Sequence, residues 1–399
     1  MRVLFASTSG MGHFNPLVPF LDAAVARGDD VLAVGPPKLE PTLAARGHAY
    51  LIGAAPPEAE TAAFRAQMAK ASPEEAEGMI DREFFGRLCT AAMLPAMEDA
   101  CDAWRPDLVL HETCEYSSVV AAERRGIRHA QVAISQARIE DLAQARTAPA
   151  LGAYGDHIVG RLKASAYLTR FPPSVDPSPY PVTRRFREAA INRPGEVEVS
   201  GDEKPLPDWW WPGSDAPLVY VTFGTMAGGK PVGDAAYRTA LDAVAGLPIR
   251  VLLTVGRATD IAALGDIPAN VHVEAWVPQA DVLGSAAAVI CHGGSGTTFG
   301  TLAAGLPLVV VPMFADQPAN ARLVESAGAG LAVSPSGEPE GRIGVPAPAD
   351  SPRIRRALES VLADDAYRQA AQRLAAEMSA LPTAGDLLDG LQGELTEQY

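Results

Sequence analysis

The feature that most constrains the fold is an alternation of short apolar segments with longer segments of helical periodicity. Strands are predicted at residues 2–7, 30–35, 49–54, 106–112 and 128–135. Helical spacing of apolar residues fills the intervals between the first three of these strands. Strands that alternate with helices form a parallel sheet covered by helices on both faces, so this half of the chain is expected to be Rossmann-like.

The same rhythm starts again in the second half, with strands predicted at 217–225, 249–256, 271–276, 287–292 and 307–313. A chain of 399 residues is long enough for two such domains. We expect an N-terminal domain over 1–200, a linker over 201–216, a C-terminal domain over 217–375, and a helical tail over 376–399 that packs back on the first domain. The linker is marked by prolines, acidic residues and the tryptophans 209–211.

Two long segments interrupt the rhythm of the first half. Residues 56–100 and 136–190 are expected to be helical or irregular insertions at strand ends, where binding surfaces usually grow. Four methionines of the first insertion belong either to the core or to an apolar acceptor pocket: Met68, Met79, Met93 and Met97.

Composition excludes some partners. The formal net charge is -15, which argues against nucleic acid because a phosphate backbone requires a basic surface. The four cysteines form no CxxC pair and are expected to be reduced, small buried side chains. The longest apolar run, 302–315, is interrupted by Pro307 and Pro312, so we expect no membrane insertion and no secretory signal. The prediction is a soluble cytoplasmic protein, monomeric or homodimeric.

A glycine-rich turn follows the strand that ends at Cys291. It reads HGGSGT and comprises His292, Gly293, Gly294, Ser295, Gly296 and Thr297. Glycines allow close approach of the backbone, and the unpaired N–H groups at a helix start favour a phosphate. His292, Ser295 and Thr297 add side-chain donors. The alternative is a turn that only joins strand to helix.

Asp316 and Gln317 follow the next strand, at the edge where parallel sheets bind ligands. A carboxylate beside an amide suits sugar hydroxyls, which both donate and accept hydrogen bonds. Asp316 followed by Pro318 is also a good helix start, and both interpretations remain open.

Further candidate contacts are weaker alone. Trp276 offers a flat face and Val277 a backbone edge for a nucleobase, and Gln279 follows them. Thr225, at the end of the first strand of the second half, could contact a phosphate.

Taken together and in this order, the motifs GMGHFNP (10–16), PDLVLHE, FGT, WVPQADVL, HGGSGT and ADQPANA resemble the inverting glycosyltransferases of family one. The resemblance is greatest to bacterial enzymes that glycosylate antibiotics, polyketides and enediynes, and it spans nearly the whole chain. It implies the GT-B fold, two facing Rossmann-like domains with an interdomain cleft. One departure is Cys291, where many bacterial relatives carry a second histidine.

The resemblance also implies roles for individual residues. His13 matches the general base and Glu112 its acidic partner. Trp276, Val277 and Gln279 match the base and ribose region, residues 292–297 the diphosphate site, and Asp316 and Gln317 the donor-sugar contacts. The donor is expected to be a dTDP-linked deoxysugar, with a UDP-sugar as the alternative, and the acceptor a hydroxyl of a small hydrophobic aglycone.

This chemistry fits the residue types. An imidazole that titrates near neutrality can remove the acceptor proton, and a nearby carboxylate fixes its tautomer. The helix after HGGSGT and His292 could stabilise the leaving diphosphate, and no D-x-D pair for a divalent ion is found. We therefore expect metal-independent transfer with inversion and no cofactor besides the nucleotide sugar.

Three other functions are alternatives to glycosyl transfer. A nicotinamide-dependent oxidoreductase requires G-x-G-x-x-G, but Asn15 stands at the third glycine position, and no acid ends the second strand. A sugar-nucleotide epimerase of the same fold is permitted by fold alone. A non-catalytic homologue is disfavoured by the presence of both His13 and Glu112.

Overall fold

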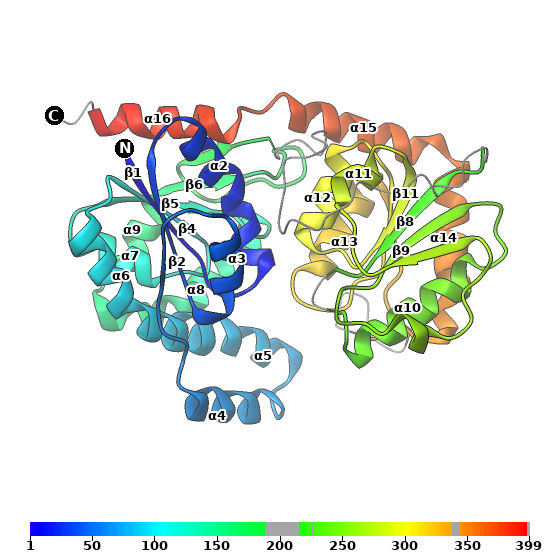
Figure 1. Cartoon of the computed structure of the whole chain (residues 1–399), viewed down its shortest axis with the longest axis horizontal. Helices are drawn as coiled ribbons and strands as arrows, with labels where there is room; N and C mark the ends of the chain where they lie inside the picture. Colours follow the sequence, from blue (N-terminus) through cyan, green and yellow to red (C-terminus); the bar gives the residue numbers. More distant parts are fainter. Residues whose placement is uncertain (188–214, 225–226, 337–343, 397–399) are drawn as a thin grey trace. The chain divides into compact units, whose positions relative to one another are not determined.

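The computed structural model describes residues 1–187, 215–224, 227–336 and 344–396. The chain divides into two units, Met1–Ala189 with Leu381–Tyr399 and Ala190–Ala380 (Figure 1). Each unit contains one parallel β-sheet with helices, which confirms the predicted α/β class.

The sheet of the first unit has seven strands in the order β3-β2-β1-β4-β5-β6-β7, all parallel. Its strands are β1 Arg2–Ala6, β2 Asp30–Gly35, β3 Tyr50–Ile52, β4 Leu108–Glu112, β5 Arg128–Val132, β6 Ala166–Thr169 and β7 Thr183–Arg185. Strands β1 and β4 are direct neighbours although about a hundred residues separate them in the chain, because β2 and β3 lie on the other side of β1.

Helices connect these strands. They are α1 Met11–Phe14, η1 Asn15–Leu17, α2 Val18–Ala26, η2 Pro37–Leu39, α3 Glu40–Ala45, α4 Glu58–Met68, α5 Pro73–Met79, the π-helix η3 Ile80–Cys89, α6 Thr90–Trp104, α7 Ser117–Glu123, α8 Ala137–Leu151, η4 Gly152–Tyr154, α9 Ile158–Ala164 and α16 Ala384–Thr396.

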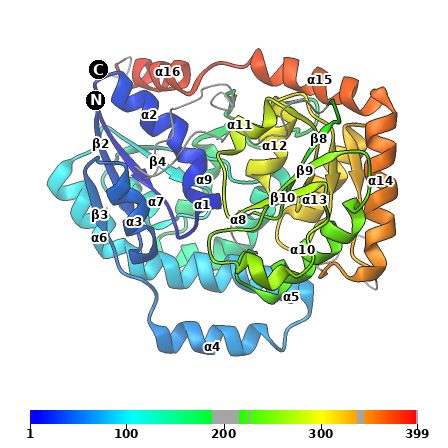
Figure 2. The same ribbon diagram turned by 45° about the vertical axis from the view of Figure 1, so that its right-hand side comes forward.

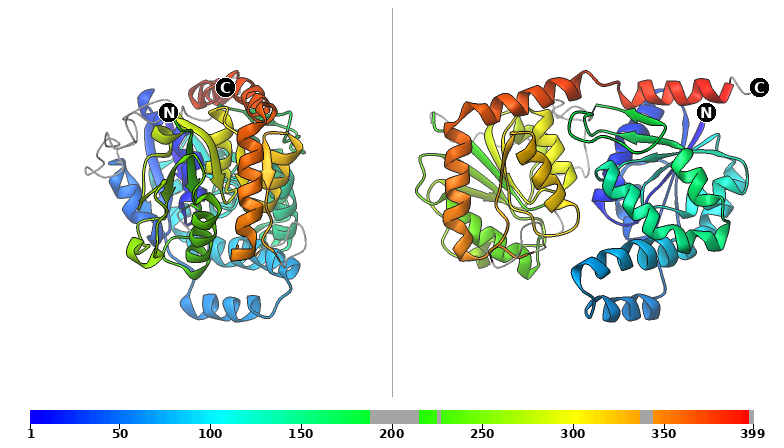
Figure 3. Two further views of the ribbon diagram at one scale, coloured as in Figure 1. Left: turned by 90° about the vertical axis from the view of Figure 1, so that its right-hand side faces the viewer. Right: turned by 180° about the vertical axis from the view of Figure 1, so that it is seen from behind.

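Alternate residues of β1 pack into the two hydrophobic cores of this unit. Val3 and Phe5 belong to the cluster that contains residues of α2 and α16, whereas Leu4 and Ala6 belong to the cluster of α6, α7 and α9. Both faces of the sheet are therefore covered, and the view from behind shows the second set of helices (Figure 3). A strand buried on both faces must be apolar throughout, as RVLFA is after its first residue.

The last helix belongs to the first unit. Leu387, Leu388 and Leu391 of α16 are part of the core that contains Leu21 of α2, and the two helices lie against each other (Figure 2). An ion pair between Arg27 and Asp389 joins the same two helices.

The sheet of the second unit has six parallel strands in the order β10-β9-β8-β11-β12-β13. They are β8 Leu218–Thr222, β9 Arg250–Thr254, β10 Val271–Glu274, β11 Ala286–Cys291, β12 Leu308–Val310 and β13 Gly330–Ala332. The helices are α10 Pro231–Val244, η5 Ile261–Leu264, α11 Gln279–Leu283, α12 Ser295–Ala303, α13 Gln317–Ser326, η6 Pro348–Asp350, α14 Ser351–Ala363 and α15 Asp365–Ser379.

Some expectations were wrong in detail. The segment 136–190, expected to be helical or irregular, contributes strands β6 and β7, and β13 was also missed. These strands have three or four residues, too few to show a period, so pairing with a neighbouring strand decides their conformation. Met93 and Met97 lie in the core, while Met68 and Met79 are half-buried. Cys101 and Cys291 are buried, whereas Cys89 and Cys114 are half-buried.

Other expectations fall outside the described residues, namely Thr225, the tryptophans 209–211 and linker positions 201–214. Within the described part of the chain, no helix has the length and apolar character needed to cross a membrane.

Candidate active site

The first site lies where the strand order of the first unit reverses. Strands β1 and β4 are adjacent, and their connections leave toward opposite sides of the sheet. The crevice beyond the carboxyl ends of such strands is where open α/β sheets bind ligands. Glu112 is the last residue of β4, and Thr8 and His13 follow β1 directly.

His13 lies in the short helix α1. Gly10 precedes this helix with φ of 118°, a conformation that residues with a Cβ avoid. The glycine therefore allows the sharp turn from β1 into α1 that brings His13 back over the strand ends.

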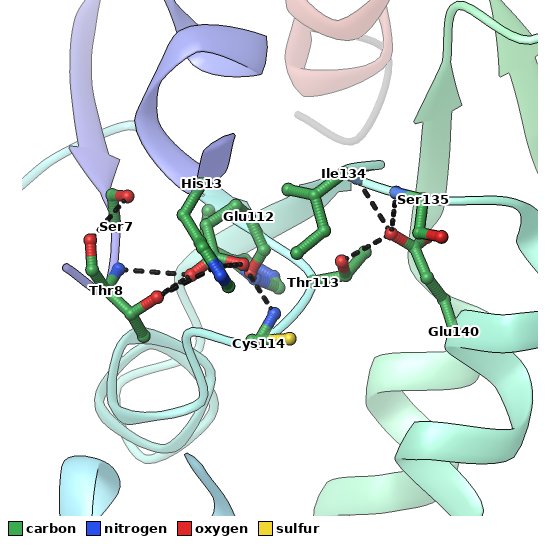
Figure 4. Close-up of polar contacts among 10 residues, drawn as sticks. Ser7, Thr8, His13, Glu112, Thr113, Cys114, Ile134, Ser135 and Glu140 are labelled. Carbon is green, nitrogen blue, oxygen red and sulfur yellow. Dashed lines mark hydrogen bonds and ion pairs between the residues drawn. The ribbon is translucent and has the colours of Figure 1, made fainter. Parts of the chain in front are cut away.

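The structure brings His13 and Glu112 together (Figure 4). The imidazole Nδ1 lies 3.2 Å from Glu112 Oε2 and 3.0 Å from Thr8 Oγ1. Thr8 donates its hydroxyl at 2.6 Å and its backbone N–H at 3.1 Å to Glu112 Oε1. The backbone N–H of Cys114 donates to Oε2 at 2.7 Å.

These contacts define the tautomer of His13. The Thr8 hydroxyl proton is committed to Glu112, so Thr8 Oγ1 can only accept from the imidazole. Glu112 Oε2 is also an acceptor, so Nδ1 carries a proton. Nε2 is then the ring nitrogen with the lone pair, and the side chain is 21% exposed, so this nitrogen can serve as a base.

Glu112 is held as a carboxylate although it is fully buried. Burial alone would raise its pKa, but the charge of His13 and hydrogen bonds from His13, Thr8 and Cys114 outweigh burial and lower the pKa below its usual range. A permanent negative charge beside Nδ1 stabilises the imidazolium that forms when Nε2 takes a proton.

Cys114 completes a group of three potential metal ligands with His13 and Glu112. Burial, followed by the charges of Glu112 and Glu140, raises the pKa of the Cys114 thiol well above its usual value, which disfavours the thiolate that a metal requires. Both oxygens of Glu112 already accept two hydrogen bonds each. The donor set therefore fits a proton-transfer pair better than a metal site.

The second site lies at the corresponding reversal in the second unit, between β8 and β11. His292 follows β11, and burial lowers its pKa to about 4 against the opposing effect of the Thr222 backbone. Its Nδ1 is buried, and no other described residue gives it a hydrogen bond of good geometry. This histidine is neutral at pH 7 and can donate one N–H.

The first two glycines after His292 leave little room for a side chain, whereas Gly296 does not face this restriction. A Cβ on Gly293, whose φ is 85°, would lie 2.7 Å from Val310 Cγ1, and one on Gly294 would lie 2.4 Å from His292 Nε2. Gly294 is the N-cap of α12, and among the described residues no side chain caps that helix. The N–H groups of its first turn, which includes Ser295, Gly296 and Thr297, can therefore face an anion.

Asp316 and the HGGSGT turn form one cluster. Ser295 Oγ donates to Asp316 Oδ2 at 2.6 Å, and Asn320 Nδ2 donates to Asp316 Oδ2 at 3.0 Å and to the Gly293 carbonyl at 2.8 Å. The Ser295 hydroxyl is thus engaged by Asp316. Helix α13 begins directly after Asp316, with Pro318 in its first turn, as the helix-start interpretation expects, but the Asp316 side chain makes no capping hydrogen bond.

Gln317 is buried, and its side-chain oxygen accepts the backbone N–H groups of Met313 at 2.8 Å and Phe314 at 3.1 Å. Its amide NH2 is therefore the group that a sugar hydroxyl could use. The neighbouring Ala315 has φ of 57°, a strained left-handed conformation that sets the direction in which Asp316 and Gln317 leave the strand end.

Trp276, Val277 and Gln279 lie at the end of β10 and the start of α11. Val277 is buried, and the guanidinium of Arg257 lies 5.0 Å from the centre of the Trp276 ring. No hydrogen bond among the described residues joins Trp276, Val277 or Gln279 to the HGGSGT turn.

Sequence reasoning missed several supporting groups. Thr8, the Cys114 N–H, Asn320 and Arg257 contact predicted residues. Asn320 stands inside the ADQPANA motif, one turn into α13, so its position was a usable signal. Thr8 lies between the predicted strand 2–7 and the GMGHFNP motif and belongs to neither. The Cys114 contact is made by the backbone N–H, so the residue type at position 114 does not reveal it.

Two Rossmann-like units in one chain, each built on a single parallel sheet, are the architecture of the GT-B fold. Residues 238–392 match the family model described as erythromycin biosynthesis protein CIII-like, C-terminal domain.

Comparison with curated relatives agrees with this family match. The chain is 29% identical to L-demethylnoviosyl transferase of Streptomyces niveus over 99% of this chain and 98% of the relative. It is 30% identical to the elloramycin glycosyltransferase ElmGT of Streptomyces olivaceus, over 97% and 96%. The structure of spinosyn rhamnosyltransferase SpnG complexed with thymidine diphosphate superposes with a TM-score of 0.79 at 22% identity, covering 98% of this chain and 100% of SpnG. The chain belongs to the family of bacterial natural-product glycosyltransferases.

Proposed function

We propose that this protein transfers a deoxysugar from a nucleoside diphosphate, dTDP in preference to UDP, to a hydroxyl of a small hydrophobic aglycone. The observation that carries the proposal is the His13–Glu112 pair, in which Nδ1 faces a buried carboxylate and Nε2 holds the lone pair. A pair of this kind suits proton removal from a hydroxyl nucleophile.

The reaction is a single displacement. As the acceptor oxygen forms its bond to the anomeric carbon, the hydroxyl proton moves to His13 Nε2, and Glu112 stabilises the resulting imidazolium. The anomeric carbon–oxygen bond to the diphosphate breaks, and its electron pair leaves with the diphosphate. One displacement inverts the anomeric centre, so an α-linked D-sugar donor gives a β-glycoside.

The diphosphate is assigned to the second unit. Neutral His292 donates an N–H, and the first-turn amides of α12 supply further donors at the positive end of the helix dipole. Asp316 and the Gln317 amide bind sugar hydroxyls, and Trp276 with Val277 receives the base. These groups are all provided by the protein, and the proposal involves no metal ion.

The relatives support the choice of donor and acceptor class. The SpnG structure holds thymidine diphosphate, another relative is named TDP-daunosamine transferase, and ElmGT is named for the antibiotic elloramycin. We therefore extend a dTDP-sugar and a hydrophobic antibiotic aglycone to this chain as part of the proposal.

A thermal-shift panel with dTDP, UDP, ADP and NAD tests the donor assignment. Ligand at ~100 times its dissociation constant adds roughly 2.7 kcal/mol to the folded state. We expect the largest shift with dTDP and a much smaller one in His292→Ala. A shift with NAD alone would overturn the proposal.

A transfer assay tests the reaction. We expect a β-glycoside from an α-linked donor, with activity that persists in EDTA. Release of an epimerised nucleotide sugar in the absence of an acceptor would instead support the epimerase alternative. Retention of configuration would overturn the single displacement.

A further inference from the structure

A second buried carboxylate, Glu140, lies next to the His13–Glu112 pair but takes no part in the proposed chemistry. It stands in the first turn of α8 and is buried. Figure 4 shows it on the other side of Thr113 from Glu112.

Four donors from separate segments converge on Glu140. Its Oε1 accepts the Thr113 hydroxyl and the backbone N–H groups of Ile134 and Ser135, each at 2.7 Å. Tyr167 Oη of β6 lies 2.5 Å from Oε2. The carboxyl group therefore ties the turn after β4 and the loop after β5 to β6.

This arrangement costs more free energy than apolar packing at the same position would. Burial outweighs the four donors and raises the pKa of Glu140 to about 8. No ion pair joins it to a cation among the described residues. Since a buried carboxyl group without a cation costs free energy that an apolar side chain would not, its benefit must lie in the groups it positions.

One of those groups belongs to the turn that holds the catalytic carboxylate. Thr113 follows Glu112 directly, and the next residue, Cys114, donates its N–H to Glu112 Oε2 at 2.7 Å. Glu140 anchors this turn through the Thr113 hydroxyl on one side, and the turn presents the Cys114 N–H to Glu112 on the other. Misplacement of a catalytic group by about 1 Å can cost about 10²-fold in rate.

We propose that Glu140 is a positioning residue for the His13–Glu112 pair, acting through the Thr113 hydroxyl on the turn 112–114. The proposal rests on the proposed function for its kinetic consequence, but the positioning itself can be measured without substrate. The alternative is that Glu140 only fastens three strand ends together.

The first test removes the Thr113 hydroxyl with the isosteric change Thr113→Val. We expect kcat to fall about 10- to 100-fold while the KM for the donor changes less than about twofold. The matched control is Thr239→Val, which removes an equally buried hydroxyl; within the described part of the chain this hydroxyl bonds only to the Ala235 carbonyl of its own helix in the second unit. The control should lose a similar amount of thermal stability and keep wild-type kcat.

The second test is rescue by the conservative variant. In Glu140→Gln the amide oxygen can still accept from Thr113, Ile134 and Ser135, and the amide NH2 can donate to Tyr167 Oη. We expect Glu140→Gln to keep kcat within about threefold of wild type, whereas Glu140→Leu should lose at least as much as Thr113→Val. Adding Thr113→Val to Glu140→Leu should cause little further loss of kcat, because both changes remove the same hydrogen bond between Thr113 and Glu140.

A substrate-free measurement separates this inference from the proposed function. The Nδ1–H of His13, held between Thr8 and Glu112, should give a slowly exchanging NMR signal that weakens in Thr113→Val and Glu140→Leu but not in Thr239→Val. An unchanged signal together with wild-type kcat in Thr113→Val would overturn the inference. If the wild-type protein transfers no sugar, the proposed function fails, and the NMR signal alone decides the role of Glu140.

Discussion

Two histidines of this protein lie at the reversal of strand order in their units, on different strands of it, and have opposite environments. His13 follows β1 and His292 follows β11, each at a reversal of strand order and each beside glycines. His13 faces the buried carboxylate of Glu112, and its side chain is 21% exposed. His292 has no carboxylate partner among the described residues, and burial lowers its pKa to about 4.

The difference shows how the same edge of two similar sheets can serve two tasks. A carboxylate beside Nδ1 prepares His13 to take a proton and hold it as an imidazolium. A desolvated imidazole without a counter-charge stays neutral, so His292 can only donate or accept a hydrogen bond. The fold supplies the strand end, and the neighbouring side chains decide whether the histidine exchanges a proton.

The largest expected effect is on the proton-accepting side. His13→Ala should lower kcat by about 10²–10⁴-fold, since it removes the general base, while the dissociation constant for dTDP stays within about twofold. Steady-state transfer kinetics and calorimetric dTDP titration measure the two quantities. The control is His157→Ala, an exposed histidine that should keep wild-type kcat. A wild-type rate in His13→Ala would remove the base assignment.

Glu112→Gln should give the next largest loss, on the order of 10²-fold in kcat, because the imidazolium loses its counter-charge. An amide NH2 would also oppose the donors at one of the two oxygen positions, either those of Thr8 or the Cys114 N–H. Transfer kinetics on Glu112→Gln, with circular dichroism to check folding, measure the effect. Full activity would mean that the carboxylate is not needed for proton transfer.

His292→Ala should instead weaken donor binding. Loss of one hydrogen bond to a charged phosphate is worth about 1.5–3 kcal/mol, which corresponds to roughly 10- to 100-fold in the dissociation constant for dTDP. Calorimetric titration measures it, with His272→Ala on β10 as a control in the same unit. If His292→Ala lowered kcat at saturating donor but left dTDP affinity intact, the contrast between the two histidines would not hold.

The smallest effect is on stability without ligand. The unfolded chain protonates His292 below its ordinary pKa of 6.5, whereas the folded chain does so only near pH 4. Between these values the unfolded state binds the extra proton, so the free energy of unfolding falls on acidification by at most about 1.4 kcal/mol per pH unit. When the pH is lowered from 6.5 to 4.5, the melting temperature of His292→Gln should fall less than that of the wild-type protein. Parallel curves for the two proteins would contradict the assignment.

The sequence predicted many residues of the candidate site but not the hydrogen bonds that connect them. His292 and Asp316 could be identified because each follows a predicted parallel strand, and parallel strand ends converge at one edge. The roles of His13 and Glu112 came from the resemblance to the glycosyltransferase family. The role of Thr8 could not be read, since a threonine after a strand is common. Glu140 could not be placed either, because its four donors come from segments far apart in the chain.

The sequence by itself determined the two Rossmann-like halves, the strands β8 and β11 and the glycine-rich turn, because periodicity and backbone requirements are local properties. Only the tertiary structure decided that β6 and β7 are strands and that His13 and Glu112 are 3.2 Å apart. Those features depend on pairing and burial between distant segments. The partners of Glu112 decide that this buried carboxylate stays ionised, and burial decides that His292 stays neutral.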